Sequence, residues 1–338
     1  MVTRPGIAKE TLTSSEFRPW ILISGGLGYV GSRLARHIAC QGIWRVRVAT
    51  RQNWSVCPAW LTNGEVVTVD FDDKNSLAKA CNGVAAVLHL AAPNEIQCAN
   101  DPESAMVANS LHTRRLLVAA RAANVSRFIR FSTIHVYGTP LNGYFDEARP
   151  TRPVHPYAIA HRSAEDWVLA AHARNEIEGL VIRLSNGFGA PVYPEIDRWS
   201  LLVNDLCRQA TRTRKCVLRS PGLDWRDFIP LATIEQAVDH LLTCQRDLLG
   251  DGLFNLGGAR SWQVIEMADL IAERCQALLG YLPTIERPAV DDLPAPLPLN
   301  YSIAKLRATG FSPMPDFHAE IDATLRFCAT HFAADALR

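Results

Sequence analysis

Three glycines in one short segment could hold a phosphate group. Ser24–Gly31 reads SGGLGYVG, which places glycines at Gly25, Gly28 and Gly31 between an apolar strand segment and a helical segment. In that context Gly25 allows a tight turn, Gly28 lets the backbone approach a pyrophosphate, and Gly31 lets helix and strand pack closely. The helix N-terminus adds unpaired N–H groups. The segment predicts a dinucleotide-binding loop, with a glycine-rich structural turn as the alternative.

The end of the second strand segment decides which dinucleotide fits. An acidic residue there would bind a ribose 2′-hydroxyl, whereas a basic residue tolerates a 2′-phosphate. Trp44–Gln52 (WRVRVATRQ) has no carboxylate and offers Arg47 and Arg51. This favours NADP(H), with NAD(H) as the alternative, unless Arg51 is only a solvated surface residue. Asp70, at the end of the third strand, either accepts from an adenine amine or caps the next turn.

Alternating strands and helices must position the glycine loop and the residues at the strand ends. Short apolar segments typical of strands are found at Trp20–Ser24, Trp44–Thr50, Val66–Asp70, Ala85–Leu90, Phe128–Ser132 and Leu180–Leu184. Helical patterns such as Ala105–Ala123 separate most of them. Parallel neighbours in a sheet need a crossover helix, so this alternation predicts an α/β fold with a Rossmann-type doubly wound parallel sheet.

After Leu184 the alternation loosens, which predicts a smaller, discontinuous C-terminal lobe that binds the substrate. Further helices are expected at about Ser200–Lys215, Thr233–Leu249, Ser261–Leu279 and Asp316–Phe332. The predicted organisation is an N-terminal extension (1–19), a dinucleotide-binding domain (20–185, with 228–258 returning to it) and a substrate lobe (186–227 and 259–338).

Composition narrows the class of protein. The 338 residues include 35 Lys+Arg and 34 Asp+Glu, a formal charge of +1. A duplex-binding surface needs clustered cations, so nucleic acid is not an expected partner. No apolar segment approaches the roughly 18 residues of a membrane span. The nine cysteines are scattered without a CxxC spacing, so neither a disulfide framework nor a metal site is predicted, and a cytoplasmic enzyme is expected.

Eight segments in order resemble the extended short-chain dehydrogenase/reductases, the NAD(P)-dependent nucleotide-sugar epimerase/dehydratase family. The resemblance covers about residues 20–330 and rests on SGGLGYVG, HLAA (His89–Ala92), Asn109, STIHVYG (Ser132–Gly138), PYAIAH (Pro156–His161), RLSNGFG (Arg183–Gly189), WRDFI (Trp225–Ile229) and FNLGG (Phe254–Gly258). It implies cofactor contacts from Gly25, Gly28, Tyr29, Val30, Gly31, Arg51, Asp70, Phe71, Leu90, Ala91, Ala92, Asn109, Tyr157 and His161.

The resemblance also implies a catalytic set of Thr133, Tyr157 and His161. The phenol takes or gives a hydroxyl proton while hydride moves to or from a nicotinamide. In the family a lysine one helical turn after the tyrosine lowers the phenol pKa and holds the nicotinamide ribose. Here that position is His161, whose imidazole carries a charge only at lower pH. Histidine substitutes for the lysine, or the site runs other acid–base chemistry, or redox chemistry is lost; lysine at 161 is expected to preserve or raise hydride transfer.

The implied substrate is a nucleotide-diphosphate sugar or a similar hydroxyl or keto compound. His135, Asn186, Arg226 and Arg287 are the candidate substrate contacts, of which Arg287 matches its motif only loosely. Related 4,6-dehydratases carry an Asp-Glu pair directly after the threonine, but this chain has Ile134 and His135, which argues against water elimination. Epimerisation and keto-reduction remain open, and a cofactor-binding protein without redox activity is the alternative. Family members often dimerise, so a homodimer is expected.

Overall fold

A seven-stranded parallel sheet forms the centre of the molecule, as predicted from the alternating segments. The computed structural model describes residues 18–52, 54, 57–289 and 296–332. Its strand order is β11-β7-β5-β4-β1-β2-β3, and every neighbouring pair is parallel. The strands are β1 (Trp20–Ser24), β2 (Arg45–Thr50), β3 (Gly64–Thr68), β4 (Val84–His89), β5 (Arg127–Thr133), β7 (Glu178–Leu184) and β11 (Leu253–Leu256).

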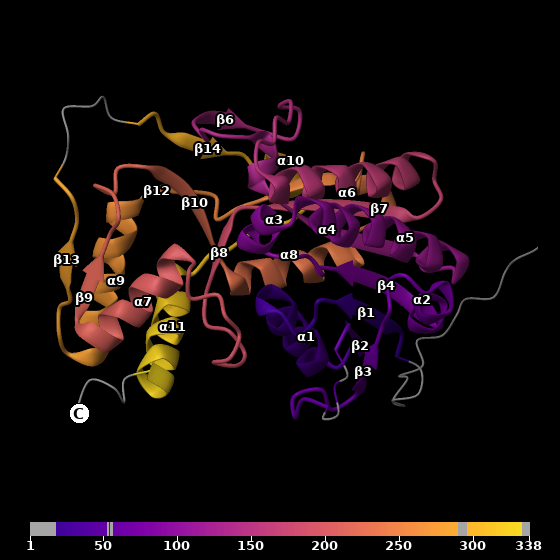
Figure 1. The fold of residues 1–338 in the computed structure, drawn as a ribbon, viewed down its shortest axis with the longest axis horizontal. Helices are drawn as coiled ribbons and strands as arrows, with labels where there is room; N and C mark the ends of the chain where they lie inside the picture. The colour runs from indigo at the N-terminus through magenta and orange to yellow at the C-terminus, as the bar shows by residue number, and fades with distance from the viewer. Residues whose placement is uncertain (1–17, 53, 55–56, 290–295, 333–338) are drawn as a thin grey trace, which may run out of the picture.

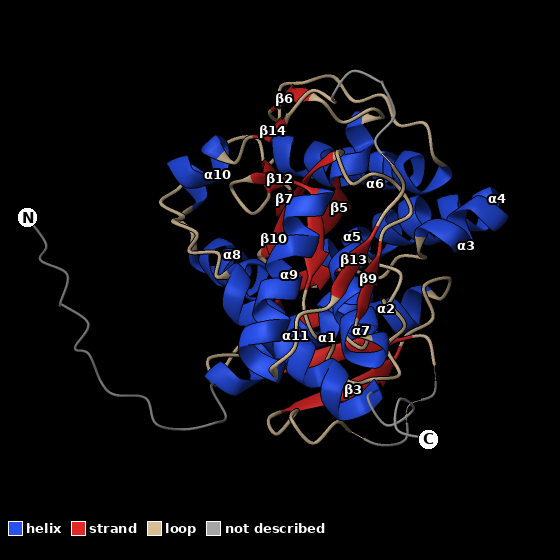
Figure 2. Ribbon diagram, turned by 90° about the vertical axis from the view of Figure 1, so that its left-hand side faces the viewer, coloured by secondary structure: helices blue, strands red, loops and turns tan. Residues whose placement is uncertain are grey.

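Helices cover both faces of this sheet (Figures 1 and 2). One apolar core contains side chains of α1 (Tyr29–Gln41) and α8 (Leu231–Thr243), and a second contains side chains of α2 (Lys74–Cys81), α5 (His112–Ala122) and α6 (Pro156–Ala173). Strands buried on both faces explain the nearly continuous apolar segments of the sequence.

Three predicted helices differ from the structure. The expected helix Ala105–Ala123 consists of α4 (Pro102–Met106), a π-helical turn (Val107–Leu111) and α5. The expected helix Thr233–Leu249 ends at Thr243 because Cys244 turns extended and Arg127 binds the carbonyls of Leu241 and Cys244. The expected helix Ser261–Leu279 starts as strand β12 (Ser261–Gln263), whose Trp262 pairs with Arg226, before α9 (Val264–Leu279).

The C-terminal lobe is built from small sheets and three longer helices, on the left of Figure 1. Helices α7 (Leu202–Thr213), α9 and α11 (Phe317–Phe332) share an apolar core. Its strands are β8 (Asn186–Phe188), β10 (Trp225–Pro230) and β12 in one sheet, and β9 (Lys215–Val217) and β13 (Thr284–Glu286) in another. A further two-stranded sheet pairs β6 (Gly143–Phe145) with β14 (Leu299–Tyr301). Short helices α3 (Glu95–Asn100) and α10 (Ala304–Ala308) and the 3-10 turns Ile134–Tyr137 and Arg246–Leu248 complete the described elements. Of the segment 228–258, α8 and β11 join the large sheet and its cover, whereas β10 pairs with β8 and β12.

Polar contacts tie α1 to the lobe. The Tyr29 hydroxyl donates to the Gly189 carbonyl (2.8 Å), and Arg33 pairs with Glu235 (3.0 Å) and with Glu320 of α11 (2.9 Å). These bonds fix the helix that follows the glycine loop against the lobe. Within the described ranges, no helix combines the length and apolarity that crossing a membrane requires.

Candidate active site

The glycine loop has the geometry that close approach to a phosphate requires. Gly25 has φ +73°, and a Cβ there would lie 2.8 Å from the Ala91 backbone nitrogen, so only glycine fits. A Cβ on Gly31 would collide with the Gly25 carbonyl. Gly28 caps α1 without a side-chain hydrogen bond, which leaves first-turn N–H groups available to an anion.

A cavity of about 490 Å³ brings the predicted loop, catalytic and lobe residues together. It begins at the glycine loop, passes the carboxyl ends of β4 and β5 and the start of α6, and ends in the lobe. Predicted residues that line it are Gly25, Gly28, Tyr29, Val30, Gly31, Leu90, Ala91, Ala92, Thr133, His135, Tyr157, His161, Asn186 and Arg226. Ligands of doubly wound sheets bind at this edge of the strands.

Thr133 and Tyr157 meet in the middle of this cavity. Thr133 ends β5, and its Oγ1 accepts from the His135 backbone N–H (3.2 Å). Tyr157 lies in the first turn of α6, where Pro156 starts the helix and His155 Nδ1 accepts from the Tyr157 N–H (3.2 Å). The helix N-terminus favours negative charge at such a position.

Several charges act on the Tyr157 phenol. Burial raises its pKa above 10.0, and Glu95 adds to the increase. Arg198, Arg130 and a hydrogen bond with Thr133 lower the pKa but do not cancel the effect of burial. The phenol is therefore protonated at neutral pH unless a ligand adds positive charge.

His161 packs on Tyr157 but carries no charge near neutrality. It is 4% exposed, and its ring centroid lies 4.4 Å from that of Tyr157. Burial, Arg130 and His135 hold its pKa well below 6.5, opposed only in part by the Phe131 backbone. Neither ring nitrogen makes a hydrogen bond of normal geometry with a described residue.

A second cavity of about 330 Å³ continues from the glycine loop over the ends of β1 and β2. Arg51, Phe71, Ala91, Ala92 and His112 are among its lining residues, and the Phe71 and His112 rings stack at 5.2 Å.

Other predicted cofactor residues lie elsewhere. Asp70 lines neither cavity, and its carboxylate accepts from the Asp72 N–H (2.8 Å), so it caps the turn. Asn109 is fully buried in the π-helical turn and lines neither cavity. Arg47 is not available for a 2′-phosphate because it donates to Glu65 (2.5 Å) and to the Ala80 carbonyl (2.7 Å).

Of the four predicted substrate residues, three line the main cavity and Arg287 does not. Arg226 and His135 line the main cavity, and partial desolvation within the cavity and the charge of Arg226 lower the His135 pKa. Asn186 Nδ2 donates to the Asp227 carbonyl (2.8 Å). Arg287 lies outside the cavity and donates to the Pro221 carbonyl (2.7 Å), so the structure does not bring it to the predicted site.

Sequence reasoning missed three charged residues. Glu95 and Arg198 line the main cavity and pair across it (3.4 Å). Arg130 is 1% exposed on β5, where it donates to the His89 carbonyl (3.1 Å) and to Asn109 Oδ1 (2.9 Å). Arg130 did leave a signal, a cation inside the apolar strand segment RFIRFST.

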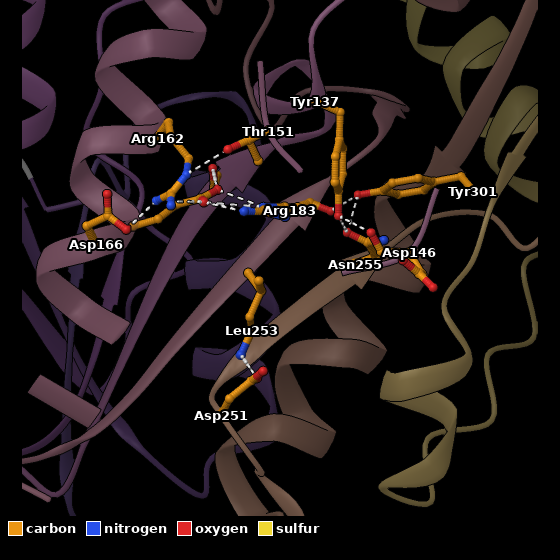
Figure 3. A network of polar contacts seen from close by, with 12 residues as sticks. Tyr137, Asp146, Thr151, Arg162, Asp166, Arg183, Asp251, Leu253, Asn255 and Tyr301 are labelled. Carbon is orange, nitrogen blue, oxygen red and sulfur yellow. Dashed lines mark hydrogen bonds and ion pairs between the residues drawn. The ribbon is translucent and has the colours of Figure 1, made fainter. Parts of the chain in front are cut away.

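A second buried arginine holds α6 against the sheet from the next strand (Figure 3). Arg183 of β7 binds Glu165 of α6 with two nitrogens (Nη2 at 2.7 Å and Nε at 3.0 Å). Its guanidinium lies 4.8 Å from the Tyr137 ring centroid, and its carbonyl accepts from Tyr301 (2.7 Å). Asn255 Oδ1 accepts from both tyrosine hydroxyls (2.8 and 3.0 Å). This network fixes the helix that carries Tyr157.

The site fits a dinucleotide. The glycine loop leaves free N–H groups, the two cavities meet at it, and both nitrogens of His161, which lines the main cavity, are buried without a hydrogen bond of normal geometry to a described residue. Buried polar atoms are rarely left unsatisfied, so these atoms indicate hydrogen bonds completed by a ligand or water. Within the part of the chain that the structure describes, no group of three or more His, Cys, Asp or Glu side chains is arranged to hold a metal ion.

Comparison with known proteins agrees with this geometry. The profile of the NAD dependent epimerase/dehydratase family matches residues 21–257, so the chain belongs to that family. A dTDP-glucose 4,6-dehydratase from Streptomyces niveus is 27% identical over 318 residues, covering 88% of this chain and 89% of its own. A UDP-glucose 4-epimerase from Streptomyces lividans is 28% identical over 274 residues (74% and 79%).

A solved structure has the same fold. The UDP-glucuronic acid 4-epimerase from Bacillus cereus, in complex with UDP-glucuronic acid and NAD, superimposes with a TM-score of 0.75 at 20% identity, covering 93% of this chain and 100% of that one. The doubly wound fold and the family expected from the eight ordered segments are thus confirmed.

Proposed function

We propose that this protein is an NAD(P)-dependent oxidoreductase that transfers hydride at a hydroxyl or keto carbon of a nucleotide-linked sugar. The observation that carries the proposal is the single cavity that joins the glycine loop, the Thr133–Tyr157 pair and the lobe residues Asn186 and Arg226. A dinucleotide at one end and a diphosphate at the other would place a sugar carbon beside the phenol.

In this proposal the dinucleotide, when bound, supplies the hydride acceptor or donor. Tyr157 takes the proton of the substrate hydroxyl during oxidation and returns it during reduction. Thr133 hydrogen-bonds the reacting oxygen. The neutral His161 completes its missing hydrogen bonds with ribose hydroxyls, for which an imidazole has a donor and an acceptor.

Asn186 and Arg226 are proposed to bind the substrate's diphosphate. A guanidinium presents parallel donors that match phosphate oxygens, and Arg226 is exposed at the cavity with no carboxylate partner among the described residues. The relatives named for dTDP-glucose and UDP-glucose favour a sugar nucleotide. Ile134 and His135 in place of an acidic pair favour epimerisation or keto-reduction over water elimination.

The test is turnover of UDP- and dTDP-linked hexoses with each nicotinamide cofactor, followed by absorbance and by product analysis. Product formation that falls by about 10²-fold or more in Tyr157→Phe supports the proposal, because general acid–base catalysis contributes about that much. Recycling of bound cofactor indicates an epimerase, and stoichiometric cofactor consumption indicates a reductase. Cofactor binding without turnover of any sugar nucleotide would contradict the proposal.

The proposed cofactor preference is NADP(H). Arg51 is exposed in the second cavity, and no carboxylate is among the residues that line it. A 2′-phosphate there would gain a charge-assisted contact.

A second candidate function is dinucleotide binding with altered or lost redox chemistry. The observation that favours it is the uncharged His161 beside a phenol whose pKa is raised. Tight cofactor binding without turnover, unchanged by Tyr157→Phe, would support this alternative.

We also propose a cytoplasmic homodimer. Apolar side chains that are at least one-third exposed gather on the adjacent π-helical turn, α5 and α6: Val107, Leu111, Val118, Ile159 and Trp167. Sedimentation equilibrium tests the dimer, and Trp167→Glu should shift it toward monomer.

A further inference from the structure

The position that lysine occupies in the family holds an uncharged imidazole here, but a cation lies on the strand next to α6. Arg130 of β5 binds the side chain of Asn109, in the π-helical turn that packs against α6. Ser132, two residues along the strand, binds Glu165 of α6 (2.5 Å), so this face of β5 points toward the helix that carries Tyr157 and His161.

Arg130 is buried and has no ion-pair partner among the described residues. It is 1% exposed, and its hydrogen bonds go to a carbonyl oxygen of His89 and an amide oxygen of Asn109. Its Nε has no hydrogen-bond partner among these residues. Glu165, whose carboxylate acts on Arg130, is bound by Arg183 and Ser132. A buried, unpaired charge is costly and persists where function requires it.

We propose that Arg130 is a positioning residue of the active site: from strand β5 it supplies the fixed positive charge that favours the Tyr157 phenolate. The inference deepens the proposed function and rests on it. In this chain the cation is an arginine on β5, and the uncharged side chain is a histidine on α6.

The charges around both side chains agree with this role. Burial lowers the Arg130 pKa, but a guanidinium keeps its proton throughout the range in which a phenol titrates. The same charge lowers the Tyr157 pKa and helps keep His161 neutral. The other charges that act on Tyr157 are Arg198 from the lobe and Glu95 from α3, which oppose each other.

The experiment measures the Tyr157 titration directly. Protein labelled with ¹³Cζ-tyrosine has seven signals, and Tyr157→Phe identifies the one of interest. In Arg130→Gln and Arg130→Met the Tyr157 pKa should rise by about one unit or more. Glutamine retains hydrogen bonding without charge, so it separates the charge from the contacts.

A matched control is Arg127→Met, which removes another arginine of β5 that lies 8% exposed and binds Glu178 and the end of α8. It should leave the Tyr157 titration unchanged. An unchanged Tyr157 pKa in folded Arg130→Gln or Arg130→Met would overturn the inference, as would an equal rise in Arg127→Met. The titration needs no substrate, so failure to turn over any sugar nucleotide would refute the proposed function alone.

Discussion

Two arginines are buried on neighbouring strands of one sheet, and they differ in what they bind. Arg183 of β7 holds the Glu165 carboxylate with two nitrogens, and Glu165 together with hydrogen bonding raises its pKa. Arg130 of β5 has only neutral oxygen acceptors, and burial lowers its pKa. The first is neutralised within the protein. The charge of the second is not offset by a carboxylate among the described residues, so it can act on the Tyr157 phenol.

The contrast between the two arginines indicates that one stabilises the fold and the other acts on the site. A carboxylate partner offsets the desolvation of a buried guanidinium, but it also removes the field that the guanidinium could exert on a neighbour. Arg183 therefore serves to hold α6 in place. Arg130 costs more to bury and can influence a proton transfer.

The largest expected effect comes from breaking the paired site. Glu165→Gln leaves the Arg183 charge buried without a carboxylate, and the free energy of unfolding should fall by about 3–5 kcal/mol in urea. Arg130→Met, by contrast, removes a charge that had no ion-pair partner among the described residues, and its loss should be smaller because only two neutral acceptors lose their donor. Equal losses of unfolding free energy in the two variants would show that the carboxylate partner of Arg183 does not distinguish it energetically from Arg130.

The sequence predicted the scaffold better than it predicted this difference. The glycine spacing and the apolar segments led to the loop and the parallel sheet, because these depend on local pattern and chain order. The Thr133–Tyr157 pair was implied by the resemblance of eight ordered segments to the family. The partners of Arg130 and Arg183 depend on side chains 21 and 18 residues away, which no local pattern specifies. Arg130 stood out only as a cation within an apolar strand, and the π-helical turn that carries Asn109 had no signal of its own.

A smaller effect on the free energy of unfolding is expected when His161→Lys places a second cation near Arg130. From the sequence alone, lysine at 161 should preserve or raise activity; Arg130 adds an expected cost in stability. His161→Lys should lower the free energy of unfolding by about 2 kcal/mol more in the wild-type background than in an Arg130→Met background, because only with Arg130 present does the new lysine make a second buried positive charge.

A double-mutant cycle of urea unfolding at pH 7.5 measures this coupling. If a positive charge at either position 130 or position 161 favours the Tyr157 phenolate, the turnover lost in Arg130→Met should recover in part when His161→Lys is added. Additive losses of stability in the cycle would mean that the two side chains do not share one space.

Acid should weaken the fold through the neutral histidine of this region. The folded pKa of His161 lies well below 6.5, so below about pH 6.5 the unfolded chain binds a proton that the folded chain does not. Its contribution to stability is complete above that pH and decreases as the pH falls. His161→Phe should reduce the slope of unfolding free energy against pH by about 1.4 kcal/mol per unit between pH 6 and 5.

The difference between variant and wild type is the quantity to compare, because other groups titrate too. Burial raises the Asp227 pKa to about 7, so its contribution decreases as the pH rises through that region, in the opposite sense. His89 acts in the same sense as His161. A His161→Phe slope equal to that of the wild type would indicate that His161 is protonated in the folded protein.

The smallest effect is expected at a third arginine, Arg51, which directly follows strand β2 and is exposed. Arg51 contrasts with both buried arginines because water screens its charge, and such contacts contribute about 0.5–1 kcal/mol. Arg51→Ala should therefore weaken NADPH binding by about two- to fivefold while leaving NADH binding unchanged, measured by nicotinamide fluorescence. The matched control is Arg47→Ala, whose guanidinium is bound to Glu65 and should not affect the ratio of the two affinities. An equal loss for both cofactors in Arg51→Ala would mean that the residue does not recognise a 2′-phosphate.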